Sequence, residues 1–191
     1  MRGRTPLQAR ARRVTMILMD VDGVMTDGRI TLVGERHEAK SFDAKDGVAL
    51  WIARRLGLMT GVISGRRSTA VVRRARELGM DEVHLGTRDK LAVYESILRR
   101  RRLSDPQVCY IGDDLVDIPV LARAGMSVAV ADAHPEVIRR ARFVTGASGG
   151  RGAVREVVDA ILKAQGHWNT VMGWFDVSPA ARRRGLRRVA R

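Results

Sequence analysis

The stretch VTMILMDVDGV, residues 14–24, is the part of the sequence that decides the fold. Val14–Met19 is a short apolar run, which suits a strand buried on both faces of a parallel sheet. Two acids, Asp20 and Asp22, follow where this strand should end. Because ligands collect at the carboxyl ends of the strands in an open α/β sheet, these two carboxylates are candidates for a functional site.

Strand and helix patterns alternate along the rest of the chain. Strands are expected at 58–63, 82–85, 108–111, 127–130 and 143–145, and helices at 47–56, 67–78, 90–101, 118–124, 153–164 and from Pro135. Segments 29–33 and 37–42 flank Gly34-Glu35 and predict a small hairpin. The alternation predicts an α/β fold, a doubly wound parallel sheet with helices on both faces. The hairpin is too small to form an independent lid, so we expect a flap and no separate cap domain.

Length and composition indicate one globular domain. A chain of 191 residues can bury a good core, and 45% apolar with 29% charged residues is not the composition of a disordered chain. The apolar runs are too short to span a bilayer, and the N-terminal segment lacks the apolar stretch of a secretory signal. A single cysteine, Cys109, excludes an internal disulfide and suits a reducing compartment, where we expect it to be a core residue. These features predict a cytoplasmic protein without a membrane span.

Positive charge is concentrated at the two ends of the chain. The net charge is +14, yet residues 16–164 contribute only +4 of it. We therefore divide the chain into a basic N-terminal extension (1–13), a catalytic domain (14–166) and a basic C-terminal extension (167–191). The favoured interpretation is that the extensions only solvate the protein. The alternative is a polyanion-binding protein that uses its basic ends, although a nucleic-acid partner is not favoured.

Further polar side chains stand at the same edge of the predicted sheet as Asp20 and Asp22. Ser64 and Asp113 follow later strands, and Lys90 opens a helix. Clustered carboxylates repel one another unless a cation neutralises them, and their hard oxygen atoms suit Mg²⁺. Asp20 and Asp113 are therefore the candidate ligands of a magnesium ion.

The same residues can be given roles in phosphoryl transfer. Asp20 could attack phosphorus to form an aspartyl-phosphate, while Asp22 protonates the leaving oxygen and later activates water. Ser64, predicted at a helix N-terminus, would bind the phosphate, and Lys90 would supply positive charge. Each feature alone is common in turns and on helix surfaces. Their order and spacing together favour a phosphatase.

Longer strings of residues extend this pattern to a family. DVDGV (20–24) resembles the first motif of the haloacid dehalogenase superfamily, and Ser64, Lys90 and GDDLVD (112–117) are similar to its other motifs. A closer resemblance, to the 3-deoxy-D-manno-octulosonate 8-phosphate phosphatases, rests on DGVMTDG (22–28), FDAKDG (42–47), VAVADAHP (128–135) and GGRGAVRE (149–156). It covers about residues 14–166.

This resemblance implies a function and a set of site residues. The implied reaction is hydrolysis of that sugar-acid phosphate in the pathway to lipopolysaccharide. Mg²⁺ would be bound by Asp20, Asp113 and the backbone carbonyl of Asp22. A homotetramer is implied, in which the hairpin around residues 28–42 and a neighbouring subunit close the site. The implied substrate contacts are Asp22, Asp43, Ala44, Lys45, Asp46, Gly47, Arg66, Arg74 and Lys90.

Two arginines and one tryptophan bear on the identity of the substrate. Arg66 and Arg74 are eight residues apart and are expected to share one helix face, where they could bind a substrate carboxylate. Trp51 stands about one helical turn after Asp46-Gly47, where the family tends to have a basic residue. The sequence therefore leaves open a second substrate, a nine-carbon, sialic-acid-like 9-phosphate.

Overall fold

Six parallel strands form the centre of the computed structural model, which describes residues 6–34 and 37–176. The strand order is β5-β4-β1-β6-β7-β8. All four residues of β1 are buried, because β4 and β6 pair with its two edges and helices cover both faces. This arrangement confirms the predicted doubly wound sheet. The strands are β1 (Met16–Met19), β4 (Met59–Ser64), β5 (Glu82–Leu85), β6 (Val108–Gly112), β7 (Met126–Ala129) and β8 (Phe143–Val144).

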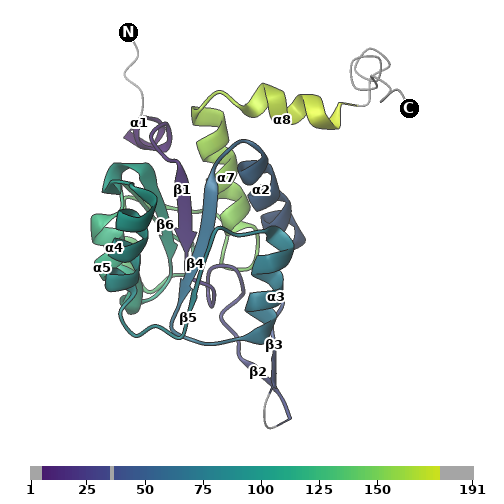
Figure 1. Cartoon of the computed structure of the whole chain (residues 1–191), viewed down its shortest axis with the longest axis vertical. Coiled ribbons are helices and arrows are strands. Elements are labelled where there is room, and N and C mark those ends of the chain that lie inside the picture. The colour runs from purple at the N-terminus through teal and green to yellow at the C-terminus, as the bar shows by residue number, and fades with distance from the viewer. Residues whose placement is uncertain (1–5, 35–36, 177–191) are drawn as a thin grey trace.

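Helices cover the sheet in two layers (Figure 1). One layer contains α4 (Lys90–Arg101) and α5 (Ile118–Arg123), with α6 (Pro135–Arg140) packed beside α5. The other contains α2 (Ala44–Arg55), α3 (Thr69–Leu78) and α7 (Ala153–Ala164). Apolar residues recur three or four positions apart in α7, which buries that face against α2 and the sheet. Cys109 is fully buried in β6, as expected, and His134 caps α6 by accepting a hydrogen bond from the Glu136 backbone.

The predicted hairpin is present as a separate antiparallel pair of strands. It consists of β2 (Thr31–Val33) and β3 (His37–Ala39), and it extends beyond the carboxyl ends of the parallel strands (Figure 1). Leu32 and Val33 are 74% and 52% exposed. Glu35, the second residue of the predicted turn, lies outside the described residues. Within the described residues the hairpin forms a flap that belongs to no separate cap domain.

Two further helices pack at the amino-terminal side of the sheet. In α1 (Pro6–Ala11) Ala11 is buried, and the Gln165 side chain donates hydrogen bonds to the carbonyls of Ala11 and Val14. In α8 (Trp168–Phe175) Val171 is buried. Both helices lie within the predicted extensions 1–13 and 167–191, whose limits stay a prediction; residues 1–5 and 177–191 lie outside the described residues. No helix of the described chain is long and apolar enough to cross a membrane.

Three local predictions are wrong, each at a helix start. The helix predicted from Gly47 begins at Ala44, because Asp43 caps it by accepting a hydrogen bond from the Lys45 backbone. Residues 44–47 are therefore a first helical turn and not a loop. The helix predicted from residue 67 begins at Thr69, so Arg66 precedes it and shares no helix face with Arg74. Likewise Ser64 is the last residue of β4 and does not open a helix.

Candidate active site

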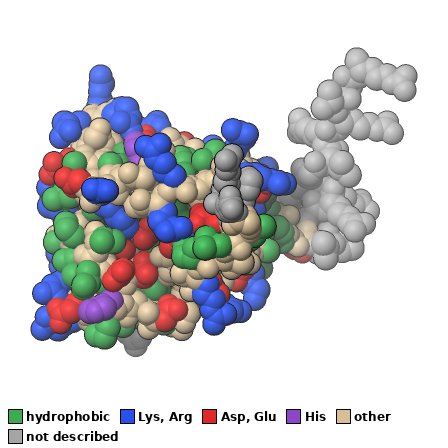
Figure 2. Space-filling view, turned by 90° about the horizontal axis from the view of Figure 1, so that it is seen from below, with side chains coloured by type: hydrophobic (Ala, Val, Ile, Leu, Met, Phe, Trp, Pro, Cys, Tyr) green, Lys and Arg blue, Asp and Glu red, His purple; other side chains and the backbone are tan. Residues whose placement is uncertain are grey.

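Three carboxylates meet where the adjacent strands β1 and β6 end. Asp20 follows β1, Asp113 follows β6, and Asp117 closes the short turn after it. One oxygen from each lies within 4.8 Å of the others. Figure 2, which views the molecule from this end, shows acidic side chains gathered near the middle of the face. The parallel register thus brings together two predicted acids and one, Asp117, that sequence reasoning left without a role.

Asp117 fixes the position of Lys90 inside this group. The Lys90 ammonium lies 2.7 Å from Asp117 Oδ1 and 2.9 Å from Asp20 Oδ2. Tyr110 also donates to Asp117 Oδ1, at 2.7 Å. The other Asp117 oxygen accepts from the backbone N–H groups of Asp113 and Asp114, at 3.1 and 3.3 Å. Asp117 is therefore fully hydrogen-bonded and fully buried, and it holds Lys90 against Asp20.

Asp20 and Asp113 each keep one buried oxygen without a hydrogen-bond partner in the described part of the chain, Oδ1 in both. Burial raises the pKa of Asp20 to about 6 although Lys90 opposes the shift. Burial, followed by the charges of Asp20 and Asp117, raises the pKa of Asp113 to about 8. Buried anionic oxygens need a hydrogen-bond donor or a cation. This pair therefore fits a divalent metal ion.

Glycines allow the surrounding loops to approach the acids closely. Gly23 has φ +92°, and any Cβ there would overlap the Asp113 carboxylate. A Cβ on Gly149 would overlap the Gly23 carbonyl, and Gly150 donates a backbone hydrogen bond of 2.9 Å to Val24. The string 149–156 therefore packs directly on the loop that follows Asp22.

The Asp22 carboxylate belongs to a second group of charges, which includes the hairpin. Lys40 pairs with Asp22 and lies 3.4 Å from Glu38, while its own side chain is 1% exposed. Arg66 lies 2.8 Å from Glu38 and 3.8 Å from Asp22. These four residues, which we call the hairpin network, tie the flap to the residue two positions after Asp20. Sequence reasoning missed Lys40 and Glu38, because neither lies in one of the catalytic motifs or at a strand end of the main sheet.

Other predicted site residues have contacts within the protein. Ser64 is buried, and its hydroxyl accepts a 3.3 Å hydrogen bond from the Arg66 backbone. Asp46 is also buried and accepts a 2.7 Å bond from the Arg155 backbone, which joins the starts of α2 and α7. Burial raises the pKa of Asp46 to about 6. The Arg74 guanidinium fills the space beside Gly47 and lies 5.9 Å from the Phe42 ring. Ala44 and Lys45 complete the first turn of α2.

Known proteins match both the sequence and the fold. A family described as haloacid dehalogenase-like hydrolase matches residues 80–157. A 3-deoxy-D-manno-octulosonate 8-phosphate phosphatase from Yersinia pestis is 44% identical over 156 residues, which cover 82% of this chain and 83% of that protein.

Two solved structures of similar phosphatases hold metal ions. One, from Moraxella catarrhalis, is a complex with a magnesium ion, a phosphate ion and a KDO molecule; it is 33% identical, with a TM-score of 0.88 over 91% of this chain and 100% of that one. The other, a cobalt-bound form from Haemophilus influenzae, is 34% identical, with a TM-score of 0.83 over 87% and 99% of the two chains. On its sequence and its fold, this chain belongs to the 3-deoxy-D-manno-octulosonate 8-phosphate phosphatase family of haloacid dehalogenase-like hydrolases.

Proposed function

We propose that this chain is a magnesium-dependent phosphatase that hydrolyses 3-deoxy-D-manno-octulosonate 8-phosphate to the free sugar acid and phosphate, a step in lipopolysaccharide synthesis. The observation that carries the proposal is the pair of unpartnered, buried oxygens on Asp20 and Asp113, with Lys90 held at 2.9 Å from Asp20. Family membership and 44% identity to the Yersinia pestis phosphatase support the substrate.

The metal site is assigned to Asp20, Asp113 and the backbone carbonyl of Asp22. Oxygen ligands of this kind favour a hard cation, and magnesium is named for the Moraxella catarrhalis relative. When bound, the ion offsets the negative charge of the phosphoryl group. Asp117 is assigned no ligand role, because Lys90, Tyr110 and two backbone N–H groups already occupy its oxygens.

The reaction then uses Asp20 as nucleophile and Asp22 as acid and base. An Asp20 oxygen attacks phosphorus, the bond from phosphorus to the sugar oxygen breaks, and Asp22 gives that oxygen its proton. Asp22 next takes a proton from water, which attacks phosphorus and releases phosphate from Asp20. Lys90 lies against Asp20 throughout and stabilises the added negative charge, while Ser64 contributes its hydroxyl to phosphate binding.

The carboxylate of the sugar acid is assigned first to Arg66. Although Arg66 pairs with Glu38 in the hairpin network, its side chain is half-exposed, so part of the guanidinium is open to a ligand near Asp22. Arg74 is less exposed and packs beside Phe42 and Gly47. We assign Arg74, with Asp43–Gly47, to the wall of the substrate site, and we do not assign it to direct binding of the sugar-acid carboxylate.

Assembly and location complete the proposal. The exposed Leu32 and Val33 give the flap an apolar surface that a neighbouring subunit would cover, which supports an oligomer; the proposed homotetramer follows from the family resemblance. Light scattering after size-exclusion chromatography measures the assembly directly. One buried cysteine in the described chain suits residence in the cytoplasm, which fractionation would test.

The nine-carbon sugar-acid phosphate is retained as the second candidate substrate. Its basis is Trp51, which is 46% exposed on α2. Trp51 packs edge-on against Trp174 at 6.2 Å, and the Arg55 guanidinium lies 5.4 Å from its ring. Packing of α8 therefore accounts for an aromatic residue at this position without a change of substrate.

Phosphate release from the two sugar-acid phosphates tests the proposal. With Mg²⁺ we expect kcat/KM at least about tenfold higher for the eight-carbon substrate, a difference of about 1.4 kcal/mol in transition-state stabilisation. Asp20→Asn is the matched inactive control. A preference for the nine-carbon substrate would reject the named substrate but keep the reaction, whereas full activity after chelation would reject the metal mechanism.

A further inference from the structure

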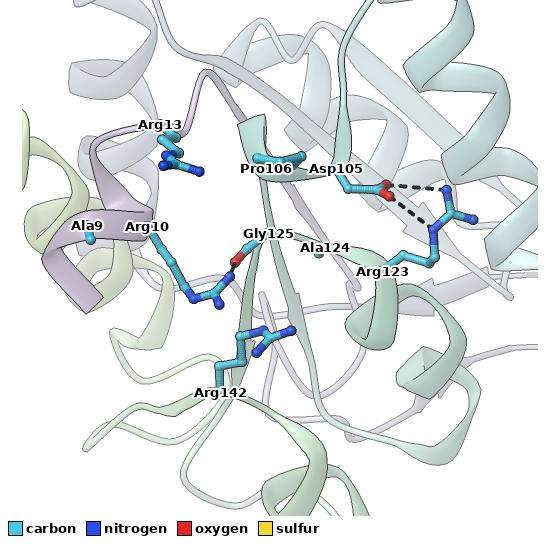
Figure 3. Close-up of a pocket in the computed structure, with 9 residues that line it drawn as sticks. All are labelled: Ala9, Arg10, Arg13, Asp105, Pro106, Arg123, Ala124, Gly125 and Arg142. Carbon is cyan, nitrogen blue, oxygen red and sulfur yellow. Dashed lines mark hydrogen bonds and ion pairs between the residues drawn. The ribbon is translucent and has the colours of Figure 1, made fainter. Parts of the chain in front are cut away.

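A second hollow lies at the opposite end of the sheet from the carboxylates. It measures about 420 Å³, and its walls include residues just before three adjacent strands: Pro106 before β6, Gly125 before β7 and Arg142 before β8. The end of α1 completes the wall (Figure 3). Because the strands are parallel, they begin at this hollow and end at the candidate active site. The two sites are therefore separated by the length of the sheet.

Arginine dominates the lining of this hollow. The lining contains four arginines, Arg10, Arg13, Arg123 and Arg142, and one acid, Asp105, which pairs with Arg123 (Figure 3). Both Asp105 oxygens are already engaged: Arg123 Nε lies 3.1 Å from Oδ2, and the Tyr94 hydroxyl donates to Oδ1 at 2.9 Å.

Three of the four guanidiniums are left without a carboxylate. Within the described residues, Arg10, Arg13 and Arg142 make no ion pair with an acid. Their charges repel one another, and only solvent, salt or a bound anion can offset that repulsion. The hollow therefore has an excess of positive charge that the protein does not neutralise.

Local packing holds part of this surface in place. An Arg10 guanidinium nitrogen donates to the Gly125 carbonyl at 2.6 Å, and Gly125 N–H donates to the Asp105 carbonyl at 2.8 Å. Any Cβ on Gly125 would overlap the backbone of Pro106, so the loop before β7 packs closely on the loop before β6. The single bond to Gly125 fixes the Arg10 head group and leaves its other N–H groups available to a ligand.

The guanidiniums approach the hollow from different parts of the fold. Arg10 and Arg13 come from α1 and the residues after it, Arg123 ends α5, and Arg142 precedes β8. A planar carboxylate presents its oxygens in one plane, whereas a tetrahedral phosphoryl group offers oxygens in several directions. We propose that the three guanidiniums without a carboxylate bind a small anion bearing phosphoryl groups in this hollow, for which pyrophosphate is the probe.

Calorimetric titration of the full-length chain with inorganic pyrophosphate tests this proposal. Divalent cations are removed from the buffer beforehand, because they bind pyrophosphate and would load the active site. The test variant is Arg13→Ala with Arg142→Ala. The control, Arg12→Ala with Arg99→Ala, removes the same charge from exposed arginines that do not line the hollow. We expect the test variant to weaken binding at least about tenfold and the control to change Kd less than about twofold.

Three outcomes would overturn the proposal. Equal losses of affinity in the two double variants would mean that net charge alone attracts the anion. A pyrophosphate Kd weaker than about 1 mM would mean that the hollow is not a binding site. Malonate binding as tightly as pyrophosphate would reject the preference for phosphoryl groups. Melting curves without ligand check the fold. If the test variant is unfolded, Arg142→Ala alone replaces it. The Arg142 side chain is exposed and has no ion pair within the described residues, so its removal should not disturb the fold. We then expect pyrophosphate binding at least about threefold weaker.

Discussion

Two neighbouring groups of carboxylates in this protein differ in how completely their charges are neutralised. In the cluster at the strand ends, burial raises the pKa of Asp20 to about 6 and of Asp113 to about 8. In the hairpin network, hydrogen bonding led by Arg66 lowers the pKa of Glu38 to about 2. Within the described residues Lys90 pairs with the acids of the first group, whereas Lys40 and Arg66 pair with the acids of the second.

The cluster at the strand ends can therefore accept an external cation, whereas the acids of the hairpin network are already paired with cations of the protein. The cluster keeps two buried oxygens unpartnered, which costs folding free energy until an ion is bound. In the hairpin network Glu38 Oε1 also lacks a hydrogen bond, but the Lys40 ammonium lies 3.4 Å from it, so the cations of the network offset its own acids and fix the position of Asp22 and the flap. Each prediction below tests one side of this contrast.

The largest expected effect is on catalysis in the cluster. Asp20→Asn should lower kcat at least about 10⁴-fold, because an amide cannot attack phosphorus. The fold should persist, since the amide matches the carboxylate in shape and removes a buried charge. Phosphate release and the melting temperature measure the two effects. Near-normal turnover by the folded variant would show that Asp20 is not the nucleophile.

The second prediction uses pH to separate the two groups. Asp113 binds a proton more tightly in the folded state than in the unfolded state, so the metal-free protein should lose stability as pH rises from about 4 to about 8. Glu38 has the opposite sign: its contribution is present above about pH 4.5 and is lost as pH falls toward about 2.

Melting curves with and without Mg²⁺ provide the measurement. At about pH 8.5 the ion meets an ionised Asp113, and at about pH 5.5 it must displace a proton. We therefore expect the increase in Tm caused by Mg²⁺ to be at least about 4 °C larger at the higher pH. Asp113→Asn should remove most of that difference. If Asp113→Asn showed the same pH dependence of the Mg²⁺-induced increase in Tm as the unaltered protein, the ion would have to bind elsewhere.

The third prediction concerns the hairpin network. Lys40→Met leaves Asp22 and Glu38 without their buried cation and should lower the free energy of unfolding by about 2 kcal/mol. The matched control is Arg29→Met, whose 85% exposed side chain lies 4.0 Å from Asp27. It should cost less than about 0.5 kcal/mol. Urea unfolding compares them, and similar losses would contradict the closed network.

The strand-end cluster was accessible to sequence reasoning because its residues sit at fixed places in the fold. Apolar runs located β1 and β6, and parallel strands in one sheet bring the residues that follow them together. The helices Lys90–Arg101 and Ala153–Ala164 were predicted with the limits that the structure shows, whereas α1 and α8, outside the predicted domain, were not predicted. In Ala153–Ala164 the apolar residues recur with a strong helical period, which determines the element.

The hairpin network was not accessible in the same way. Its members come from a loop, from the flap and its end, and from the second residue after β4, and their contacts depend on how the flap folds back. Asp117 was missed because its partners, Lys90 and Tyr110, are 27 and 7 positions away. The cap at Asp43 was overlooked because Gly47 interrupts the helical pattern, although the chain is helical from Ala44.

The smallest effect is expected outside both groups, at the basic C-terminal end. Residues 177–191 contain six of the arginines, and the site residues assigned above all lie before them. Their removal should therefore leave kcat/KM within about twofold while weakening binding to polyanions.

Trimming from residue 167 also removes Trp174, which lies 4.9 Å from the Arg55 guanidinium, and should lower the free energy of unfolding by about 1 kcal/mol. Kinetics, oligomer size and melting curves distinguish the two truncations. A tenfold loss of kcat/KM on removing 177–191 alone would mean that about 1.4 kcal/mol of transition-state stabilisation depends on that segment, and the end could then no longer be treated as a solvating extension.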